Sequence, residues 1–460
     1  MSIIHDPALH ELRQQLRGHV YDPGEPEYDE ACTLFNARIE RRPRHVVRAS
    51  RPHHVAAALE YARLRDLRVA VRAGGHSVAG LSLVDDGIVI DVRGFREITV
   101  DPVRRVVRAG AGLTWSELDA ATQAHGLATV GGRVSSTGVA GLALGGGSGW
   151  LERKHGLACD NILAVELVTA NGDEVRASAG EHPELFWALR GGGGNFGVVT
   201  ALEFALHPVG PEVLGGLLLH PASRGRELLR LFRDVMNDAP DELSLAFVYL
   251  NAPDEEDIPA ALRGRPAVAI AGMYAGPIDE AERALAPIRA YGPPALDAFG
   301  PVGYADFQCS IDDPPGYRNW WTAEYLEDLT EEAIEAIASL SEELPPGPAQ
   351  IFIPAWGGAV ARVPAGATPL AKRDARYVVH PLLLWEDAAE DERMIAFGRR
   401  YRDVLAPYRT GGTYLNFIGD EGADRVRAAY GPHHERLARV KAGWDPDNVF
   451  RATGNVRADD

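Results

Sequence analysis

The residues best suited to chemistry lie in one short loop, residues 69–80, with the sequence VAVRAGGHSVAG. A strand-like run ends at Arg72, two glycines follow, and His76 and Ser77 stand side by side before Gly80. A tight loop of this kind can present backbone N–H groups to phosphate oxygens, with an imidazole at its tip. Ser77 is the alternative centre of chemistry, as a nucleophile on a sharp turn.

The nucleophile alternative places Ser77 in an elbow like that of serine hydrolases, which requires a strand, a sharp turn and then a helix. Residues 81–92, LSLVDDGIVIDV, instead predict a loop followed by a strand. A hydrolase would also be labelled at Ser77 by a fluorophosphonate. We expect no such labelling.

Two further glycine-rich segments favour a large ligand. Residues 131–150, GGRVSSTGVAGLALGGGSGW, are about half glycine or small residues, which costs chain entropy. Such a glycine-rich segment usually allows a flat or charged group to lie close to the backbone. Residues 192–197, GGGNFG, match the dinucleotide fingerprint, but a helix precedes them and a strand follows, which is the wrong order for that site.

The composition excludes several classes of function. With 460 residues, two or three domains are expected. A net charge of −18 argues against nucleic acid as a partner. The three cysteines show no disulfide or zinc spacing, so no metal site is predicted. Without a signal peptide or membrane-length apolar run, we expect a cytoplasmic protein with no membrane partner.

The pattern of elements changes near residue 210. Before it, short strands alternate with helices, among them residues 52–66 and 114–125, and Asn171-Gly172 predicts a hairpin. After it, we expect strands separated by amphipathic helices, a pattern typical of an antiparallel sheet with helices on one face. The expected strands are 213–220, 243–250, 266–274, 350–362 and 376–385. The segments 250–262 and 292–318 are expected to be loops.

Four ordered strings resemble the vanillyl-alcohol-oxidase superfamily, and its berberine-bridge-enzyme-like branch in particular. RAGGHSVAG is similar to the flavin-attachment loop of that family, and residues 131–161 are similar to its flavin-cradling segment. ELFWALRGGGGNFGVVT and the C-terminal GGTYLNFIGDEG with YGPHHERLARVKAGWDPDNVFR complete the likeness. The matches span some 400 residues.

The resemblance implies an α+β fold, with a bipartite PCMH-type FAD-binding domain and an inserted substrate domain of antiparallel sheet backed by helices. The implied boundaries are 1–209 and 410–460 for the FAD-binding domain and 210–409 for the substrate domain.

The resemblance also assigns cofactor-binding residues. His76 is the covalent attachment point, and a histidine bonded to the flavin both tethers it and raises its redox potential. The other residues expected around FAD are Arg72, Gly74, Gly75, Ser77, Gly80, Ser135, Ser136, Thr137, Gly138, Gly141, Gly197, Val199, Tyr414 and Asn416.

Three positions depart from the family pattern. Where many members carry a second, cysteinyl bond to the flavin, this chain has Val134, so a single covalent bond is expected. The position that is often valine at the oxygen gate is Thr137, which is still small. The familiar tyrosine base at the end of the Y-x-N-Y string is Phe417, which cannot accept a proton.

Two residues remain as candidates for the base. His380, in RYVVHPLLLW, stands where relatives often carry Gln or Glu facing the substrate, and imidazole suits base work near neutral pH. The alternative role of His380 is structural, as a strand histidine that is hydrogen-bonded on the outer face of the sheet. Tyr414 is the second candidate, with positioning of the cofactor as its alternative role.

We therefore expect an FAD-linked oxidoreductase that removes hydride from a C–H next to O or N of a small molecule, such as an alcohol, amine, sugar or specialised metabolite. Dioxygen would take the electrons and give H2O2. The alternative is a flavoprotein that guides a non-redox cyclisation or rearrangement, which the missing tyrosine at Phe417 keeps open. The sequence predicts neither the substrate nor the oligomeric state.

Overall fold

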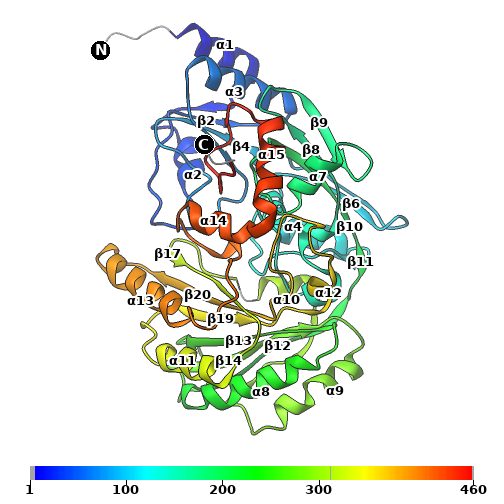
Figure 1. The fold of residues 1–460 in the computed structure, drawn as a ribbon, viewed down its shortest axis with the longest axis vertical. Helices are drawn as coiled ribbons and strands as arrows, with labels where there is room; N and C mark the ends of the chain where they lie inside the picture. The colour runs from blue at the N-terminus through cyan, green and yellow to red at the C-terminus, as the bar shows by residue number, and fades with distance from the viewer. Residues whose placement is uncertain (1–5, 311, 458–460) are drawn as a thin grey trace.

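The computed structural model describes residues 6–310 and 312–457. Helix α1 (Pro7–Leu16) is capped by Asp6, whose carboxylate accepts hydrogen bonds from the first-turn N–H groups. Helices and largely antiparallel sheets together confirm the predicted α+β class (Figure 1).

Two small sheets form the N-terminal part of the chain. The first contains, in spatial order, β1 (Val20–Tyr21), β2 (His45–Arg48), β4 (Ile88–Asp91) and β3 (Val69–Arg72). The second is antiparallel and contains β5 (Ile98–Asp101), β6 (Val106–Gly110), β10 (Val198–Ala205), β8 (Ile162–Val168) and β9 (Glu174–Ser178). Because β2 and β3 both run parallel to β4, helix α3 (Pro52–Leu64) makes a crossover, and β3 delivers the His76 loop at its carboxyl end.

Nine strands between Glu212 and Trp385 form the large antiparallel sheet. Its main path is β15 (Leu296–Asp297), β12 (Glu212–Pro221), β14 (Pro266–Tyr274), β13 (Leu243–Asn251), β19 (Gln350–Pro354), β20 (Tyr377–Trp385) and β17 (Arg318–Trp321). Two short strands lie off this path, β16 (Gly300–Gly303) beside β12 and β18 (Glu324–Leu326) beside β20.

The two faces of the large sheet have different neighbours. Four helices cover the outer face, namely α8 (Gly225–Asn237), α9 (Ile278–Arg289), α11 (Glu331–Ser341) and α13 (Asp391–Val404). The first three lie at the bottom of Figure 1, and α13 lies at the left. On the inner face, Trp321, Phe352 and Leu382 pack with Phe35 and Val78 of the N-terminal part. This inner interface brings the sheet to the His76 loop.

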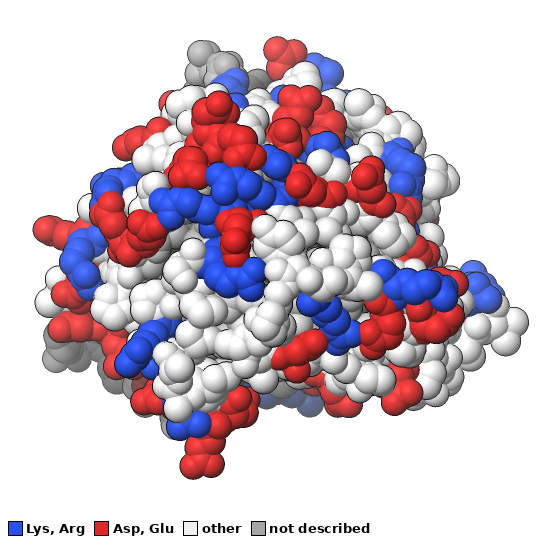
Figure 2. Space-filling model, turned by 90° about the horizontal axis from the view of Figure 1, so that it is seen from below, with Lys and Arg blue, Asp and Glu red and all other residues white. Residues whose placement is uncertain are grey.

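Paired charges cover part of the outer helical face. Arg226, Arg230 and Arg233 of α8 form ion pairs with Glu331, Glu335 and Glu342 on and next to α11. Figure 2 shows both signs of charge interspersed on this side of the molecule rather than separated into patches. Among the described residues, no helix is both long enough and apolar enough to cross a membrane.

The C-terminal segment returns to the N-terminal part, where α14 (Ala423–Tyr430) and α15 (His434–Trp444) lie beside the small sheets (Figure 1). Lys441 of α15 is buried, and its ammonium donates to the Asn195 carbonyl at 2.8 Å and to the Asp445 carboxylate at 2.5 Å. The Asn195 amide in turn donates to the Gly454 carbonyl at 3.1 Å. The last part of the chain thereby fixes the 192–197 loop.

Most predicted elements are present, with two corrections. The predicted strand 350–362 ends at Pro354, and α12 (Gly358–Arg362) follows because Gly357 and Gly358 have φ of +99° and +51°, which break the strand. The predicted loop 292–318 contains β15, β16 and α10 (Tyr304–Cys309). The remaining elements are α2 (Pro26–Cys32), α4 (Trp115–Gln123), β7 (Leu127–Ala128), α5 (Val139–Leu144), α6 (Glu152–His155), α7 (Pro183–Leu189) and β11 (His207–Pro208).

Candidate functional site

The loop after β3 lies backbone to backbone against the turn that precedes α5. A Cβ atom on Gly74 would collide with Gly138, and one on Gly138 would collide with Gly74, so neither position has room for a side chain. Gly75 has a φ of +76°, which glycine adopts without strain. Two segments that lie about 60 residues apart in the sequence therefore place His76 next to Ser136.

The His76 ring is held on one face and at one nitrogen. Its face stacks on Phe35, with ring centroids 4.5 Å apart and an angle of 20° between the planes. Its Nε2 atom lies 3.0 Å from the Ser136 hydroxyl. Burial, together with the positive charge of Arg72, lowers the pKa of His76 to about 4. The imidazole is therefore neutral at physiological pH and carries one free nitrogen lone pair.

Arg72 offers hydrogen-bond donors that the described residues do not use. The residue is 5% exposed, and one guanidinium nitrogen donates to the Thr33 carbonyl at 2.9 Å. Its Nε and Nη1 atoms are buried and have no partner among the described residues. Burial and the nearby Arg93 lower the Arg72 pKa to about 10, so the group is still charged at neutral pH. Buried, charged and unsatisfied donors fit an anion such as a phosphate.

Ser77 and Gly80 close the turn of the same loop. The Ser77 hydroxyl accepts a hydrogen bond from the Leu81 N–H at 3.2 Å, and the Ser77 carbonyl accepts one from the Gly80 N–H at 2.9 Å. No described hydrogen bond joins the Ser77 hydroxyl to an imidazole. The geometry gives Ser77 a structural partner and no base.

The segment from Ser135 to Gly141 is bonded to Asp312, which lies between β16 and β17. The Ser135 N–H donates to the Asp312 carboxylate at 2.6 Å, and the Ser135 hydroxyl donates to the other oxygen of the same carboxylate. Thr137 is half-buried and its carbonyl accepts a hydrogen bond from the Trp115 N–H at 3.0 Å. A Cβ atom on Gly141 would meet no atom within 4 Å, so open space lies next to α5.

Tyr414 and Asn416 reach this segment from the C-terminal side. The Tyr414 hydroxyl accepts hydrogen bonds from the N–H groups of Gly147 and Ser148 at 2.5 and 3.0 Å, and from the Asn416 amide at 3.1 Å. The Asn416 amide also donates to the Leu142 carbonyl at 3.0 Å. Burial raises the pKa of Tyr414 above its usual value. The phenol is thus a neutral, fixed support rather than a group ready to accept a proton.

His380 lies on the inner face of the large sheet, since its partner on β19 is Phe352 of the inner-face cluster. It is 1% exposed, and its Nδ1 lies 2.9 Å from the Thr322 carbonyl. A carbonyl only accepts, so Nδ1 carries the proton and Nε2 carries the lone pair. Nε2 has no partner among the described residues. Burial lowers the pKa of His380 to about 3, against the opposing hydrogen bond to Thr322.

A continuous series of aromatic contacts joins the predicted site residues. Successive ring centroids are 4.5, 5.8, 5.4, 4.2 and 4.8 Å apart along the order His76, Phe35, Trp321, His380, Phe417, Tyr414. The series therefore places the histidine of the loop and the histidine of the sheet along the same inner interface, although about 300 residues separate them in sequence.

Gly197 and Val199 lie apart from this series, at the start of β10. A Cβ atom on Gly197 would lie 2.7 Å from the Val168 carbonyl, so glycine is needed where the chain passes β8. Val199 is 4% exposed in the core of the N-terminal part. Gly197 is the last residue of the 192–197 loop and Val199 follows it, so both are separate from the imidazoles of His76 and His380.

Sequence reasoning missed several residues that shape the site. Phe35 and Asp312 belong to segments with no motif, and only the folded contacts reveal them. Asn195, Lys441 and Asp445 stood inside quoted strings, GGGNFG and VKAGWDPD, but nothing local indicated that they bond one another. The one signal in the sequence was the spacing of Lys441 and Asp445, because residues four apart on a helix can form an ion pair.

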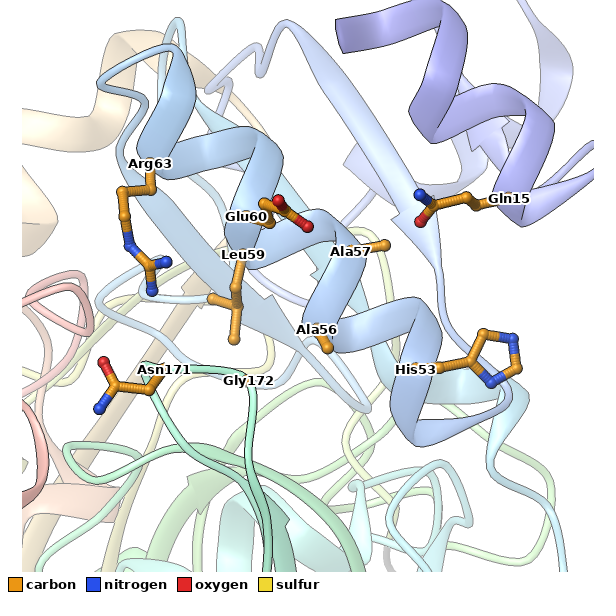
Figure 3. A pocket seen from close by; sticks show the side chains of 9 residues that line it. All are labelled: Gln15, His53, Ala56, Ala57, Leu59, Glu60, Arg63, Asn171 and Gly172. Carbon is orange, nitrogen blue, oxygen red and sulfur yellow. The ribbon is translucent and has the colours of Figure 1, made fainter.

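A pocket on the outer surface lies elsewhere. It has a volume of about 620 Å³ and is lined by residues of α1 and α3 and by the Asn171-Gly172 turn (Figure 3). None of the predicted site residues lines it. This surface pocket is therefore separate from the predicted site residues at the inner interface.

Comparison with known proteins agrees with the geometry. Residues 43–178 match the family model described as FAD binding domain, and residues 413–457 match the model described as berberine and berberine like. The chain is 32% identical to (R)-6-hydroxynicotine oxidase of Paenarthrobacter nicotinovorans over 462 aligned residues, which cover 96% of this chain and 97% of that protein. The chain belongs to the berberine-bridge-like FAD-linked oxidoreductases.

Other members of this oxidoreductase family are similar over their whole length. The FAD-linked oxidoreductase YgaK of Bacillus subtilis (strain 168) is 30% identical, with 95% of this chain and 96% of that protein covered. The structure of 6-hydroxy-D-nicotine oxidase from Arthrobacter nicotinovorans superposes with a TM-score of 0.86 at 31% identity, covering 96% and 98% of the two chains. The BBE-like 1 protein of Physcomitrella patens superposes with a TM-score of 0.83 at 25% identity, covering 96% and 97% of the chains.

The site residues of this FAD-linked oxidoreductase fit the cofactor. The unsatisfied Arg72 donors suit a pyrophosphate, and the side-chain-free contact of Gly74 with Gly138 leaves the backbone open to a flat ligand. The neutral imidazole of His76 stands at the edge of the same site.

Proposed function

We propose that this protein is an FAD-dependent oxidase that removes hydride from a C–H bond next to nitrogen or oxygen in a small organic molecule, and that dioxygen takes the electrons to give H2O2. The observation that carries the proposal is the state of His380. It is a buried, neutral imidazole with a free Nε2 lone pair on the face of the sheet that meets the flavin loops. The Nε2 atom can accept the proton that substrate oxidation releases, and because burial lowers the pKa of His380 to about 3, the ring would hold that proton only briefly before passing it on.

The FAD cofactor supplies the hydride acceptor. In the proposal, His76 bonds to it covalently, and Val134 at the position of the family's cysteine leaves this as the single bond. Residues 72–80 and 135–141 hold the pyrophosphate and the ring system, and Gly197 and Val199 lie on the adenine side. In the proposal, the domain formed by residues 1–209 and 410–460 binds the cofactor, and the domain formed by residues 210–409 binds the substrate.

We assign proton removal to His380 and support of the cofactor to Tyr414 and Asn416. The Tyr414 hydroxyl already accepts three hydrogen bonds, and burial raises its pKa, so both facts argue against its use as a base. Phe417 has no acceptor atom and instead stacks on His380. The base thus comes from the sheet and not from the C-terminal string.

Substrates with a C–H next to nitrogen are the first class to test. The relative at 32% identity is named for the oxidation of 6-hydroxynicotine, a nitrogen heterocycle, and both chains match over nearly their full length. The small Thr137 side chain at the gate position supports access of dioxygen to the site.

The test mixes the purified protein anaerobically with panels of cyclic amines, alcohols and sugars and follows the visible flavin absorbance. A true substrate bleaches the flavin, and admission of air then restores the colour with one H2O2 per turnover. A substrate that is rearranged without any bleaching would overturn the oxidase proposal in favour of a non-redox role. Acid precipitation tests the tether, because a His76→Ala variant should release all of its FAD and the native chain none.

A further inference from the structure

Two consecutive aspartates bond to opposite sides of the inner interface. The Asp312 carboxylate accepts hydrogen bonds from the N–H and the hydroxyl of Ser135. The next residue, Asp313, accepts a hydrogen bond from the Gln350 amide of β19 at 3.1 Å. The chain between β16 and β17 thus places one carboxylate beside residues 135–141 and the next one beside the large sheet.

The Asp313 carboxylate lies over the inner face of that sheet. Gln350 and Phe352 are two residues apart, so their side chains point to the same face of β19. Phe352 packs with the inner-face cluster, whereas Ile351 and Ile353 lie in the core under the outer helices. Asp313 is half-buried, and its second carboxylate oxygen makes no hydrogen bond with the described residues. One oxygen is therefore fixed, and the other is free to bind a ligand.

The free nitrogen of His380 is directed at the same part of the inner face. Its Nδ1 atom points to Thr322, between β17 and β18, and both of these strands pair with β20 on the side away from β19. The two nitrogens of an imidazole point in largely opposite directions, so the unpartnered Nε2 atom points toward the β19 side. There the register pairs Phe352 with His380, which makes Gln350 the diagonal neighbour of the imidazole. Asp313 is bonded to that glutamine.

The charges around Asp313 favour a cation as the ligand. Burial and the negative charge of Asp312 raise the pKa of Asp313 from 3.8 to about 7. Arg133 lies over the Phe352 ring, with its Cζ atom 5.2 Å from the ring centroid, but its charge is paired with the buried Glu152. The neutral imidazole on β20 adds no charge. A bound positive charge would compensate the two aspartates, whereas a bound anion would be repelled by them.

We propose that Asp313 determines the substrate class of this site by binding the positively charged group of a small organic cation. The proposal rests on the oxidase function above and narrows its substrates. A protonated nitrogen has no lone pair to support loss of hydride from the carbon next to it, so the charged group and the oxidised C–H belong to different parts of the molecule. Diamines and amino alcohols have this chemistry. A neutral hydroxyl can donate to the same carboxylate oxygen, but it forms the weaker hydrogen bond.

The first experiment compares two ligands of nearly the same shape on the FAD-loaded protein by titration calorimetry. Benzamidinium is a cation that keeps its charge from pH 6 to pH 8, and benzamide is its neutral counterpart. Neither has a C–H bond next to nitrogen that the enzyme could oxidise. We expect benzamidinium to bind at least about tenfold more tightly at pH 8. Equal affinities, or no measurable binding of benzamidinium, would overturn the proposal.

The proton that the cation displaces is the second readout. Because the pKa of Asp313 is about 7, binding at pH 7 should release about half a proton from the native protein, and the affinity should rise about tenfold from pH 6 to pH 8. Calorimetry in two buffers of different ionisation enthalpy counts this proton. The native protein suffices for this measurement. Benzamidinium binding without any proton release would overturn the role of Asp313.

Variants locate the effect at one carboxylate. Asp313→Asn keeps the shape of the side chain and should bind both ligands alike without proton release, while Asp312, Arg133 and His380 all stay in place. Asp257→Asn, on an exposed loop, removes the same charge and should behave as the native protein. A preference for benzamidinium that survives in Asp313→Asn would overturn the proposal. If the native preference is present but no diamine or amino alcohol bleaches the flavin, the cation site is supported and the oxidase function is the part that fails.

Discussion

The imidazole of His380 lies flat on the phenyl ring of Phe417, with centroids 4.2 Å apart and an angle of 3° between the planes. Phe417 stands at the position where the family resemblance implies a tyrosine base, and its phenyl ring has no atom that accepts a proton. The phenyl ring fixes the orientation of the imidazole, and Thr322 fixes its tautomer.

Replacement of His380 should remove the base without removing the cofactor. We expect His380→Gln to slow substrate reduction of the flavin by about a hundredfold to ten-thousandfold, the usual worth of a general base. Rapid-mixing absorbance under anaerobic conditions measures this rate. The matched control is His220→Gln, since His220 is also a buried strand histidine of the large sheet but contacts Arg224 on the outer helical side. Equal losses in both variants would contradict the assignment.

A tyrosine at position 417 tests directly whether His380 serves as the base in place of the family's tyrosine. In a His380→Ala background, Phe417→Tyr should recover at least about tenfold in flavin reduction, because it returns a phenol to the family's position. In the native background the same change should have little effect, since His380 already accepts the proton. A large gain from Phe417→Tyr alone would show that the imidazole is not the working base.

Asp119 makes stability depend on pH. It is 1% exposed, and the only described hydrogen bond to its carboxylate is from the Gln308 amide at 3.3 Å. Burial raises its pKa from 3.8 to about 7, against the effect of that bond. Between these pH values the unfolded chain loses the proton while the folded chain keeps it, so this residue makes the free energy of unfolding fall as pH rises.

Asp119→Asn should remove this fall in the free energy of unfolding at higher pH. We expect the stability of the variant relative to the native protein to grow from pH 4 to pH 7, by more than about 1 kcal/mol, and to stay level above pH 7. Urea unfolding at several pH values measures the difference. Asp254→Asn, on an exposed loop, is the control and should show no such trend. A difference that does not vary with pH would mean that Asp119 is charged when folded.

Lys441 should be essential for the packing of the C-terminal segment against the N-terminal part. Lys441→Met leaves the buried Asp445 carboxylate without its cation and removes the bond to the Asn195 carbonyl, so a loss of about 3 to 5 kcal/mol is expected. Thermal unfolding and FAD content measure the effect together. Lys372→Met, at a half-buried site outside this group, should change neither. Retention of normal stability in the first variant would contradict this account.

Local chemistry in the sequence predicted much of the fold. Asn171-Gly172 specifies a hairpin by itself, and β8 and β9 pair on either side of it. Thr114 and Glu117 specify the start of α4, and both capping bonds are present. The string from Arg72 to Gly80 depends on its own turn chemistry, which is why its shape was predictable.

The rest of the site depends on contacts that no local pattern carries. Every residue of β20 is buried, so the strand lacks the polar alternation that would indicate which face His380 occupies. Only the pairing of His380 with Phe352 reveals it. The contacts of Phe35 with His76 and of Asp312 with Ser135 join distant segments in the same way.

The bonds from Asn195 to residues 453–456 and Lys441 also set an order of events during synthesis. A ribosome makes the 192–197 loop about 250 residues before the side chains that hold it, and the whole large sheet emerges in between. A polypeptide cut short after that sheet would lack the side chains that hold the 192–197 loop. The hydrogen bonds that hold this loop can therefore form only after the last residues of the chain have been made.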